Sequence, residues 1–484
     1  MNFSYAAQRS AALRSLTGQI LDVLVIGGGI VGAGVARDAA MRGLKTGLVE
    51  QNDFAFGTSG RSSRLLHGGI RYLAQGRIGL VREASLEKSV LHRIAPHLAQ
   101  PLPLIFPTYR GTDWPLWQMR IGVKIYDLLC SGKNLGKSSG LSKAETLAAI
   151  PQLKPEKLTG AVRYFDGLTN DARLVLDTLR SASHEGATVL NYCEYEAGSR
   201  NGETWACQVI DKVAGQTHEV RARAVVNASG PWADGLLHSG VKLRLTKGIH
   251  LVMERSRIPT ADAVVLTEGK RILFVIPWGE RLILGTTDTD YSGPLDDIRA
   301  DQGDISYLLR VANEYFPQAR LNEADIISAW AGVRPLLANA NGTASDISRA
   351  HEIRNPEPNW WDVAGGKLTT YRLMAEQTVD KLAAAAKLSA KPCRTASEPL
   401  LVKADGFSGI LPPKFSREMV AHYCTEEWSL HLDDLMIRRT SWHYYETDAV
   451  NKAREAADWM GQILGWTEAE KAAELERYHA HRRI

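Results

Sequence analysis

The sequence predicts an α/β protein with one parallel sheet, one antiparallel sheet and a helical C-terminal region. Three observations predict this fold class. An apolar run at residues 21–26 leads into three glycines and an alanine-rich stretch, the pattern of a buried strand followed by a helix. Residues 241–349 contain short apolar runs separated by turn residues, which is typical of antiparallel strands. Residues 400–484 are aromatic and helical in pattern.

Length and composition limit the classes of protein to consider. At 484 residues the chain is too long for one ordinary domain, so two or three are expected. Hydrophobic residues make up 44% and charged residues 23%, as in ordinary globular proteins. The net charge of +4 suits an anionic small substrate or an anionic membrane surface, and it argues against nucleic acid as a partner.

The cysteines and the N-terminus indicate the compartment. Five scattered cysteines without a CxxC pair argue against a disulfide framework and against a metal site. They are Cys130, Cys193, Cys207, Cys393 and Cys424. Arg9, Arg14 and Asp22 interrupt the apolar runs, so no signal peptide is expected, and no stretch reaches the roughly 20 apolar residues of a transmembrane helix. We expect a cytoplasmic protein, soluble or bound peripherally to a membrane.

A glycine-rich turn follows the first strand. Gly27, Gly29 and Gly32 form the pattern GxGxxG between the strand at 21–26 and a helix at 33–42. In this pattern the first glycine permits a tight turn, the second lets a pyrophosphate approach the backbone, and the third lets helix and strand pack closely. The N-terminus of the helix presents unpaired N–H groups to the phosphates. The turn therefore predicts a bound dinucleotide.

An acidic residue narrows the choice of dinucleotide. The next strand, at 45–49, delivers Glu50 about twenty residues after the glycines, where a carboxylate can bind both hydroxyls of an adenosine ribose. A 2′-phosphate would be repelled there. FAD or NAD is therefore favoured over NADP.

The later segments favour FAD over NAD. A loop at 54–73, rich in Gly, Ser and Arg, stands where an NAD-binding domain would continue with regular βα units. A buried strand at 222–226 ends near Gly230, and a strand at 361–364 ends in a second glycine turn before a helix at 372–386. A helix N-terminus at that turn would stabilise the negative charge of a reduced flavin. The nucleotide domain is thus expected to combine three separated stretches.

Seven motifs together resemble the FAD-dependent glycerol-3-phosphate dehydrogenases, over roughly residues 20–390. They are VIGGGIVGAG with Glu50, TSGRSSRLLHGGIRYL, NASGPWAD, RILFVIPW, GTTDTDY, AGVRPLL and AGGKLTTYR. The resemblance implies a glutathione-reductase-type FAD domain, an antiparallel-sheet substrate domain and a helical C-terminal cap. It also implies oxidation of sn-glycerol 3-phosphate to dihydroxyacetone phosphate, with hydride transfer to flavin N5 and electrons passed to a quinone.

The resemblance suggests a division of the chain. The FAD domain is expected at 1–75, 156–240 and 350–390, the substrate domain at 76–155 and 241–349, and the cap at 391–484. Residues 423–439 and 449–464 resemble the latter half of the family's cap. The cap is shorter than in the family, because few residues separate Lys391 from Tyr423. This departure leaves a role of the cap in dimerisation or membrane contact open.

The resemblance also assigns residues to the cofactor and the substrate. The expected cofactor-binding residues are Gly27, Gly29, Gly32, Glu50, Thr58, Ser59, Ser62, Ser63, His67, Gly230, Gly366, Lys367, Leu368 and Thr369. His67 contacts the flavin or caps a helix. Arg334 and Arg349 match the phosphate-binding arginines, since guanidinium forks suit a phosphate dianion. Arg334 lies in an apolar stretch, whereas Arg349 rests on the resemblance alone.

Alcohol oxidation at a flavin also needs a base and a group that polarises the substrate oxygen. We nominate His250 as the base, because histidine accepts a proton near neutral pH, with a purely structural role as the alternative. Arg71 and Lys367 are candidates to polarise the oxygen. Tyr72 matches a family position beside substrate and flavin.

Rival interpretations stay open at this point. An oxidase or dehydrogenase of another anionic hydroxy or amino acid shares the architecture, and Arg334 would then bind a carboxylate. A non-catalytic flavoprotein and an NAD-dependent enzyme are further alternatives. The expected partners are a small phosphorylated substrate, a quinone or another electron acceptor such as oxygen, and no nucleic acid. A homodimer is left open.

One helix suggests contact with a membrane. Residues 113–133 place apolar side chains at helical spacing among basic ones, as an interfacial helix does. They are Trp114, Trp117, Ile121, Ile125 and Leu128 among Arg120, Lys124 and Lys133. The protein would then lie on the cytoplasmic face of the inner membrane. The alternative is a helix that packs this stripe on its own domain.

Overall fold

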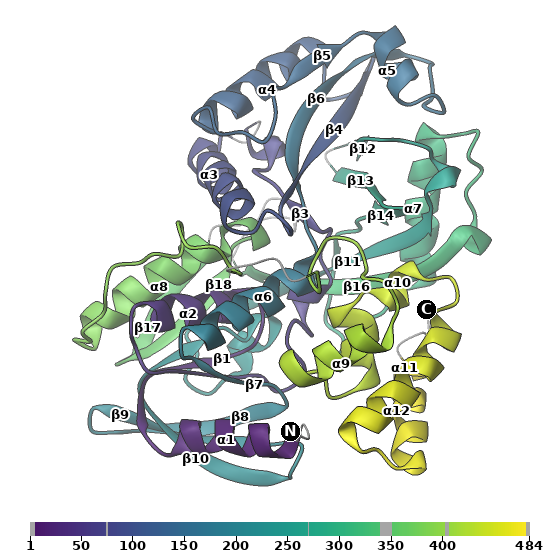
Figure 1. Ribbon diagram of the computed structural model, residues 1–484. Coiled ribbons are helices and arrows are strands. Elements are labelled where there is room, and N and C mark those ends of the chain that lie inside the picture. The colour runs from purple at the N-terminus through teal and green to yellow at the C-terminus, as the bar shows by residue number, and fades with distance from the viewer. Residues whose placement is uncertain (1–4, 74–75, 270, 339–350, 402–405, 481–484) are drawn as a thin grey trace.

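The computed structural model describes residues 5–73, 76–269, 271–338, 351–401 and 406–480. It contains two sheets and a group of C-terminal helices (Figure 1). In Figure 1 the mostly antiparallel sheet lies at the top, the mostly parallel sheet at the lower left and the C-terminal helices at the lower right. The predicted α/β class is confirmed.

The first sheet brings together strands that are far apart in the sequence. Its order is β17 (His351–Glu357), β18 (Trp360–Gly365), β10 (Gln216–Asn227), β1 (Ile20–Ile26), β2 (Thr46–Val49) and β7 (Thr188–Leu190). The strands from β18 to β7 are parallel. β8 (Cys193–Asn201) and β9 (Thr204–Asp211) extend β10 as an antiparallel meander. The three expected stretches thus supply β1 and β2, β10, and β18.

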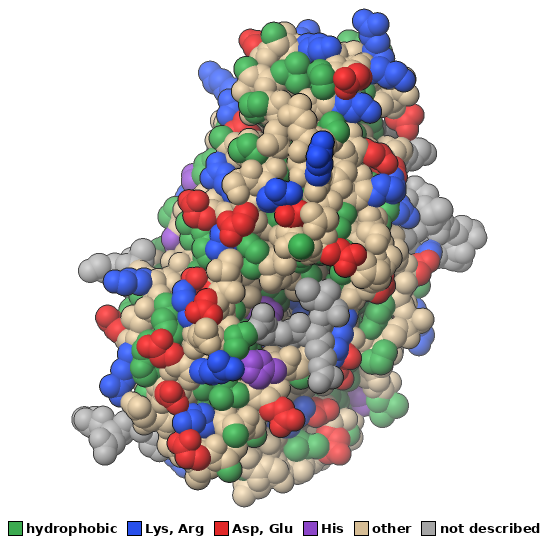
Figure 2. Space-filling view, turned by 90° about the vertical axis from the view of Figure 1, so that its right-hand side faces the viewer, with side chains coloured by type: hydrophobic (Ala, Val, Ile, Leu, Met, Phe, Trp, Pro, Cys, Tyr) green, Lys and Arg blue, Asp and Glu red, His purple; other side chains and the backbone are tan. Residues whose placement is uncertain are grey.

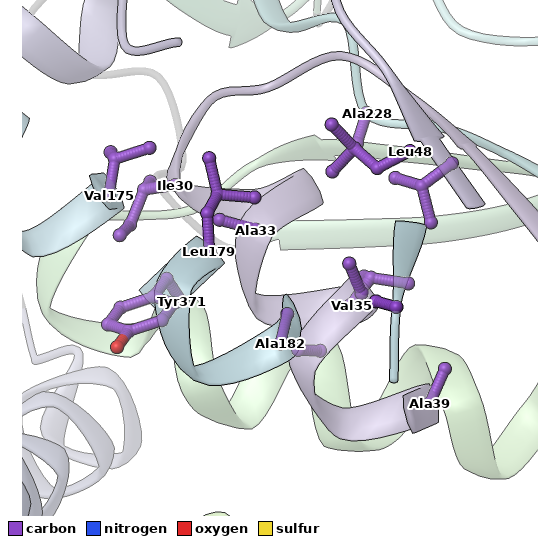
Figure 3. Packing of buried hydrophobic residues seen from close by; sticks show 14 of the residues in the cluster. Ile30, Ala33, Val35, Ala39, Leu48, Val175, Leu179, Ala182, Ala228 and Tyr371 are labelled. Atoms are coloured by element: carbon purple, nitrogen blue, oxygen red, sulfur yellow. The ribbon is translucent and has the colours of Figure 1, made fainter. Parts of the chain in front are cut away.

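Helices cover this sheet and close its core. They are α1 (Tyr5–Thr17), α2 (Ile30–Met41), α6 (Asp171–His184) and α8 (Tyr371–Ala385). α2 packs against both α6 and α8, where Gly34 leaves room for the ring of Tyr371. Figure 3 shows this core, with Ile30 and Ala33 of α2 close to Val175 and Leu179 of α6. This packing holds the N-terminus of α2 in place directly after the glycine turn.

The second sheet carries the other half of the site. Its order is β15 (Thr289–Asp290), β11 (Leu243–Glu254), β14 (Arg281–Gly285), β13 (Arg271–Trp278), β12 (Ala263–Glu268), β4 (Gln100–Tyr109), β6 (Leu158–Leu168) and β3 (Leu65–Leu66). β16 (Ile326–Leu337) also pairs with β11, and β5 (Ser139–Leu141) with β6. The pairing is antiparallel except between β12 and β4. The remaining helices here are α3 (Ile78–Ile94), α4 (Leu116–Leu129), α5 (Lys143–Ala149) and α7 (Gln302–Tyr315).

Two strands of this sheet come from stretches that the sequence assigned to the FAD domain. β6 begins at Leu158 and β3 lies at Leu65–Leu66, and the two strands pair with each other. β6 pairs with β4 over its whole length, so it cannot be separated from the second sheet. We therefore propose that the boundary between the units lies after Leu168 rather than at residue 155.

The C-terminal region contains α9 (Arg417–Glu426), α10 (Trp442–Tyr445), α11 (Ala449–Leu464) and α12 (Glu468–Ala480). The expected helical character of this region is confirmed. Within residues 423–439, α9 ends at Glu426 and a six-residue π-helix follows at Asp434–Arg439. Trp428 adopts a left-handed conformation between them, with φ of 56°. A left-handed residue ends an α-helix, so the chain changes direction between these two helical segments.

The described surface agrees with the charge balance. Figure 2 shows one face of the molecule, on which acidic and basic side chains are intermixed. No helix in the described part of the chain is long and apolar enough to cross a membrane.

Candidate active site

The glycine turn at the end of β1 is built so that only glycine fits. Gly27 has a φ of 108°, and a Cβ there would lie 2.6 Å from the carbonyl oxygen of Ala228. A Cβ on Gly32 would collide with the Gly27 carbonyl oxygen. The backbone of the turn therefore runs close both to β10 and to α2, as the sequence pattern predicts. We propose that Gly32 supports the turn without touching the cofactor.

The loop after β2 closes over the N-terminus of α2. The Ser59 hydroxyl accepts a hydrogen bond of 2.9 Å from the backbone N–H of Ile30, and Gly29 lies directly beneath this serine. Thr58 donates to the Val333 carbonyl oxygen at 2.7 Å, which ties the same loop to β16. A helix N-terminus with hydroxyl groups beside it is an arrangement that binds anions.

Glu50 marks one end of the site. Its two carboxylate oxygens accept backbone hydrogen bonds from Gly28 at 2.6 Å and from Asn52 at 2.8 Å. Burial raises the pKa of the Glu50 carboxyl, and these two N–H donors oppose that rise. The side chain is thus held rigidly beside the glycine turn, in the position expected for a group that binds ribose hydroxyls.

A cavity of about 300 Å³ runs from Glu50 to the second sheet. Most of the predicted site residues line it. They are Gly27, Gly29, Glu50, Thr58, Ser59, Ser62, Ser63, His67, Gly230, Gly366, Lys367, Leu368 and Thr369, with His250 and Arg334 from the second sheet. Gly32 and Tyr72 do not line it.

Lys367 lines the cavity directly after the second glycine turn. Its ammonium nitrogen lies 3.5 Å from the Gly68 carbonyl oxygen and 4.3 Å from the centroid of the Tyr72 ring. Thr369 and His67 hydrogen-bond each other, with the His67 N–H donating to the Thr369 hydroxyl at 3.0 Å. Tyr72 is 1% exposed, so we propose that it positions Lys367 and does not contact substrate.

His250 projects from β11 between two neighbouring strands. It lies opposite Gly285 of β14 and Trp330 of β16, and its ring stacks on Trp330 at 5.1 Å. Its Nε2 is 2.8 Å from the Ser63 hydroxyl oxygen. Burial lowers the pKa of His250 well below 6.5, and the charges of Arg334 and Arg64 lower it further. The imidazole is therefore neutral near pH 7, in the form that can accept a proton.

Arg334 lies on the same face of the sheet as His250. It is opposite Thr246, four residues before His250 on β11, and alternate residues of a strand share a face. Its guanidinium donates to the Thr286 hydroxyl at 3.1 Å and to Asp288 at 3.2 Å. The motif GTTDTDY thus orients this arginine toward the cavity. Arg349 and the side chain of Arg71 lie outside the described residues.

Sequence reasoning missed several lining residues, of which Arg61 is the most important. Its backbone crosses Gly332, and its guanidinium stacks on Phe56 at 5.1 Å. Within the described residues no carboxylate lies within ion-pair distance of Arg61, and burial lowers its pKa. Arg61 and Phe56 also line an adjoining cavity of about 340 Å³. The signal available was local: Arg61 stands inside the Gly-Ser-Arg loop already assigned to the cofactor.

Comparison with known proteins defines the class of the protein. The model of the DAO family, described as FAD dependent oxidoreductase, matches residues 22–380. The chain is therefore an FAD-dependent oxidoreductase, and FAD as its cofactor is confirmed. The cavity fits this group, because a helix N-terminus for the pyrophosphate and a carboxylate for the ribose stand at one end, with polar groups at the other.

The relatives define the family more closely. The chain is 36% identical to glycerol-3-phosphate dehydrogenase of Mycobacterium leprae, over 98% of this chain and 90% of that protein. It is 38% identical to aerobic glycerol-3-phosphate dehydrogenase of Staphylococcus aureus, over 80% and 72%. The solved glycerol-3-phosphate dehydrogenase of Bacillus halodurans, complexed with FAD, superposes with a TM-score of 0.79 at 30% identity, covering 98% and 97%. The chain belongs to the glycerol-3-phosphate dehydrogenase family, and the resemblance stated from its motifs is confirmed.

Proposed function

We propose that the protein oxidises sn-glycerol 3-phosphate to dihydroxyacetone phosphate. The observation that carries this proposal is the arginine at the substrate end of the cavity, in a chain that is 36% and 38% identical to two glycerol-3-phosphate dehydrogenases. Solved amino-acid oxidases such as glycine oxidase share the fold at 21% identity. Fold alone does not separate these substrates, and the arrangement of charges favours the phosphate.

The basic residues of the site have separate roles. Arg334 binds the phosphate, since its fork is held open toward the cavity by Thr286 and Asp288. Lys367 faces the same space and stabilises negative charge that develops on the substrate oxygen. We assign a second phosphate contact to Arg349 and a second polarising contact to Arg71 from the family motifs alone.

His250 accepts the hydroxyl proton of the substrate. It is neutral near pH 7 and lies on the same sheet face as Arg334, so one small molecule can contact both. FAD, when bound, supplies the hydride acceptor for the carbinol carbon. The residues from Glu50 to Ser63 and from Gly366 to Thr369 hold that cofactor, and a quinone-type acceptor takes up the electrons afterwards.

The function is tested by the visible spectrum of the purified protein under anaerobic conditions. Addition of glycerol 3-phosphate is expected to bleach the oxidised flavin bands, because the hydride has no other acceptor. Glycerol without phosphate, at the same concentration, is the control and should leave the bands in place. Bands that persist with glycerol 3-phosphate but bleach with an amino acid or a 2-hydroxy acid would replace the proposed substrate.

We further propose that α4 docks on an anionic membrane surface. Met119, Val123 and Tyr126 form the buried face of this helix. The opposite face exposes an apolar stripe with Arg120 and Lys124 beside it. The stripe consists of Trp117 (67% exposed), Ile121 (54%), Ile125 (42%) and Leu128 (77%). Trp114 is not part of it, because its ring packs on Phe106.

Sedimentation with vesicles that contain phosphatidylglycerol tests this docking. We expect the protein to bind at low salt, and Leu128→Glu to abolish binding, because a carboxylate opposes both the apolar and the electrostatic attraction. Leu237→Glu is the matched control, since Leu237 is 85% exposed but distant from α4, and it should bind as the unaltered protein does. Absence of binding by the unaltered protein at low salt would sink the proposal.

A further inference from the structure

The segment between Glu50 and the loop at Gly57 connects the two parts of the chain that frame the adenosine and phosphate end of the cavity. Asp53 lies in the middle of this segment and is fully buried. We propose that the C-terminal helices retain FAD by holding this segment, with Asp53 as the positioning residue. The inference rests on the FAD-binding roles proposed above for Glu50 and for the loop at Thr58 and Ser59.

Two consecutive arginines of the C-terminal region bind Asp53. Arg439 donates to Asp53 Oδ1 at 2.8 Å through Nη2 and pairs with Oδ2 through Nη1. Arg438 donates from Nε to Asp53 Oδ2 at 2.5 Å. Both arginines stand at the C-terminal end of the π-helix at Asp434–Arg439, and both reach this one carboxylate. Such helices are rare and frequently occur at functional sites.

A second set of contacts runs parallel to this ion pair. The Asn191 amide donates both to Asp53 Oδ1 at 3.0 Å and to the Trp428 carbonyl oxygen at 2.9 Å. The Trp428 ring meets Phe54 edge-on at 5.4 Å. Phe54 in turn lies so close to Gly28 that a Cβ there would be 2.5 Å from its ring. The C-terminal region is thus packed, through Phe54, against the glycine turn itself.

The attachment depends on Asp53 being ionised. Burial alone would raise the pKa of this carboxyl, but Arg439 and Arg438 hold it below its ordinary value. Arg438 also binds Asp433 and Asp434, so it keeps counter-charges without Asp53. In the described structure Arg439 has no other carboxylate within ion-pair distance. Removal of the Asp53 charge therefore leaves mainly Arg439 without a counter-charge, and it weakens the attachment of the segment that carries Asp53.

Docking of the C-terminal helices and binding of FAD must then strengthen each other. If the C-terminal helices stabilise the segment in its FAD-binding form, FAD stabilises the docked C-terminal helices by the same factor. A merely structural ion pair would lower the stability of the fold without this coupling. The coupling gives the test a readout that is independent of catalysis and of the identity of the substrate.

The test measures FAD binding to the apoprotein by flavin fluorescence. Asp53→Asn keeps the shape and removes the charge, and it is expected to raise the Kd for FAD about tenfold or more. Asp325→Asn is the matched control, because Asp325 forms a bidentate pair with Arg257 beside the second sheet, and neither residue lines the cavity. It should change the Kd by less than about threefold.

Hydrogen exchange supplies the second measurement. In the unaltered protein FAD is expected to slow amide exchange in residues 417–440, and in Asp53→Asn it should not. If Asp53→Asn fails to fold, Arg439→Lys serves instead, since it keeps the charge and loses the fork. A variant that binds FAD as tightly as the unaltered protein, or FAD-dependent protection that survives in Asp53→Asn, overturns the inference. Neither result bears on glycerol 3-phosphate as the substrate.

Discussion

Replacement of Arg334 by alanine is expected to raise the KM for glycerol 3-phosphate by about 100-fold or more, with a smaller fall in kcat. The guanidinium is held in place by Thr286 and Asp288, so it is already oriented before substrate arrives. A phosphate dianion that loses this fork leaves its charge unpaired inside the cavity. Steady-state rates with a dye acceptor measure the effect.

A neighbouring arginine provides the control for Arg334. Arg244 lies on β11 opposite Leu336 and pairs with Asp290 at 2.7 Å, but it does not line the cavity. Arg244→Ala should change KM by less than about twofold, because exposed ion pairs contribute little. Equal effects of the two replacements would point to a general electrostatic attraction of the substrate rather than to a binding site at Arg334.

Replacement of His250 by glutamine is expected to slow flavin reduction by about 10²- to 10⁴-fold at saturating substrate. Glutamine retains most of the volume that stacks on Trp330 and a group that can bond Ser63, but it cannot accept the substrate proton. Stopped-flow absorbance under anaerobic conditions measures this step directly. His92→Gln is the control, because the His92 ring bonds the Ala99 carbonyl oxygen at 2.7 Å and does not line the cavity. An unchanged rate in His250→Gln would leave His250 with a structural role.

The environment of His250 also sets the pH dependence. Because its pKa in the folded state lies well below 6.5, the imidazole stays neutral as the pH falls from 8 to 6.5, and no loss of activity from its protonation is expected there. The unfolded chain binds a proton at this position below about pH 6.5, while the folded chain does not. The contribution of His250 therefore lowers the free energy of unfolding as the pH drops from about 6.5 to the pKa of His250 in the folded state.

Local motifs allowed much of the cofactor end to be predicted. Gly27, Gly29 and Glu50 stand where the pattern placed them, because a strand, a turn and a helix in register define their geometry over a short stretch. The identity of the cofactor also followed, since the glycine turn before Lys367 returns to the same cavity. These features depend on sequence neighbours or on motifs with a fixed structural context.

Features that depend on distant pairing were not predictable in the same way. β6 is buried on both faces along much of its length, so its sequence lacks the alternation that would assign it to a half-exposed sheet. Trp428, just after α9, packs on Phe54 from the beginning of the chain, a contact that no local pattern indicates. Tyr72 carries no local sign that it lies beneath Lys367. Arg349 and the side chain of Arg71 lie outside the described residues, so their roles stay predictions.

The ion pair between Asp53 and the arginines at 438 and 439 has a consequence for the order of synthesis. The ribosome makes Asp53 early, and its counter-charges follow only near the end of the 484-residue chain. β18, which completes the parallel sheet, also emerges late, at residues 360–365. A nascent chain therefore carries an incomplete cofactor cradle with an uncompensated carboxylate for most of its translation. Tight binding of FAD is therefore expected only after residues 360–440 have been made, so that chains terminated before residue 360 bind FAD poorly.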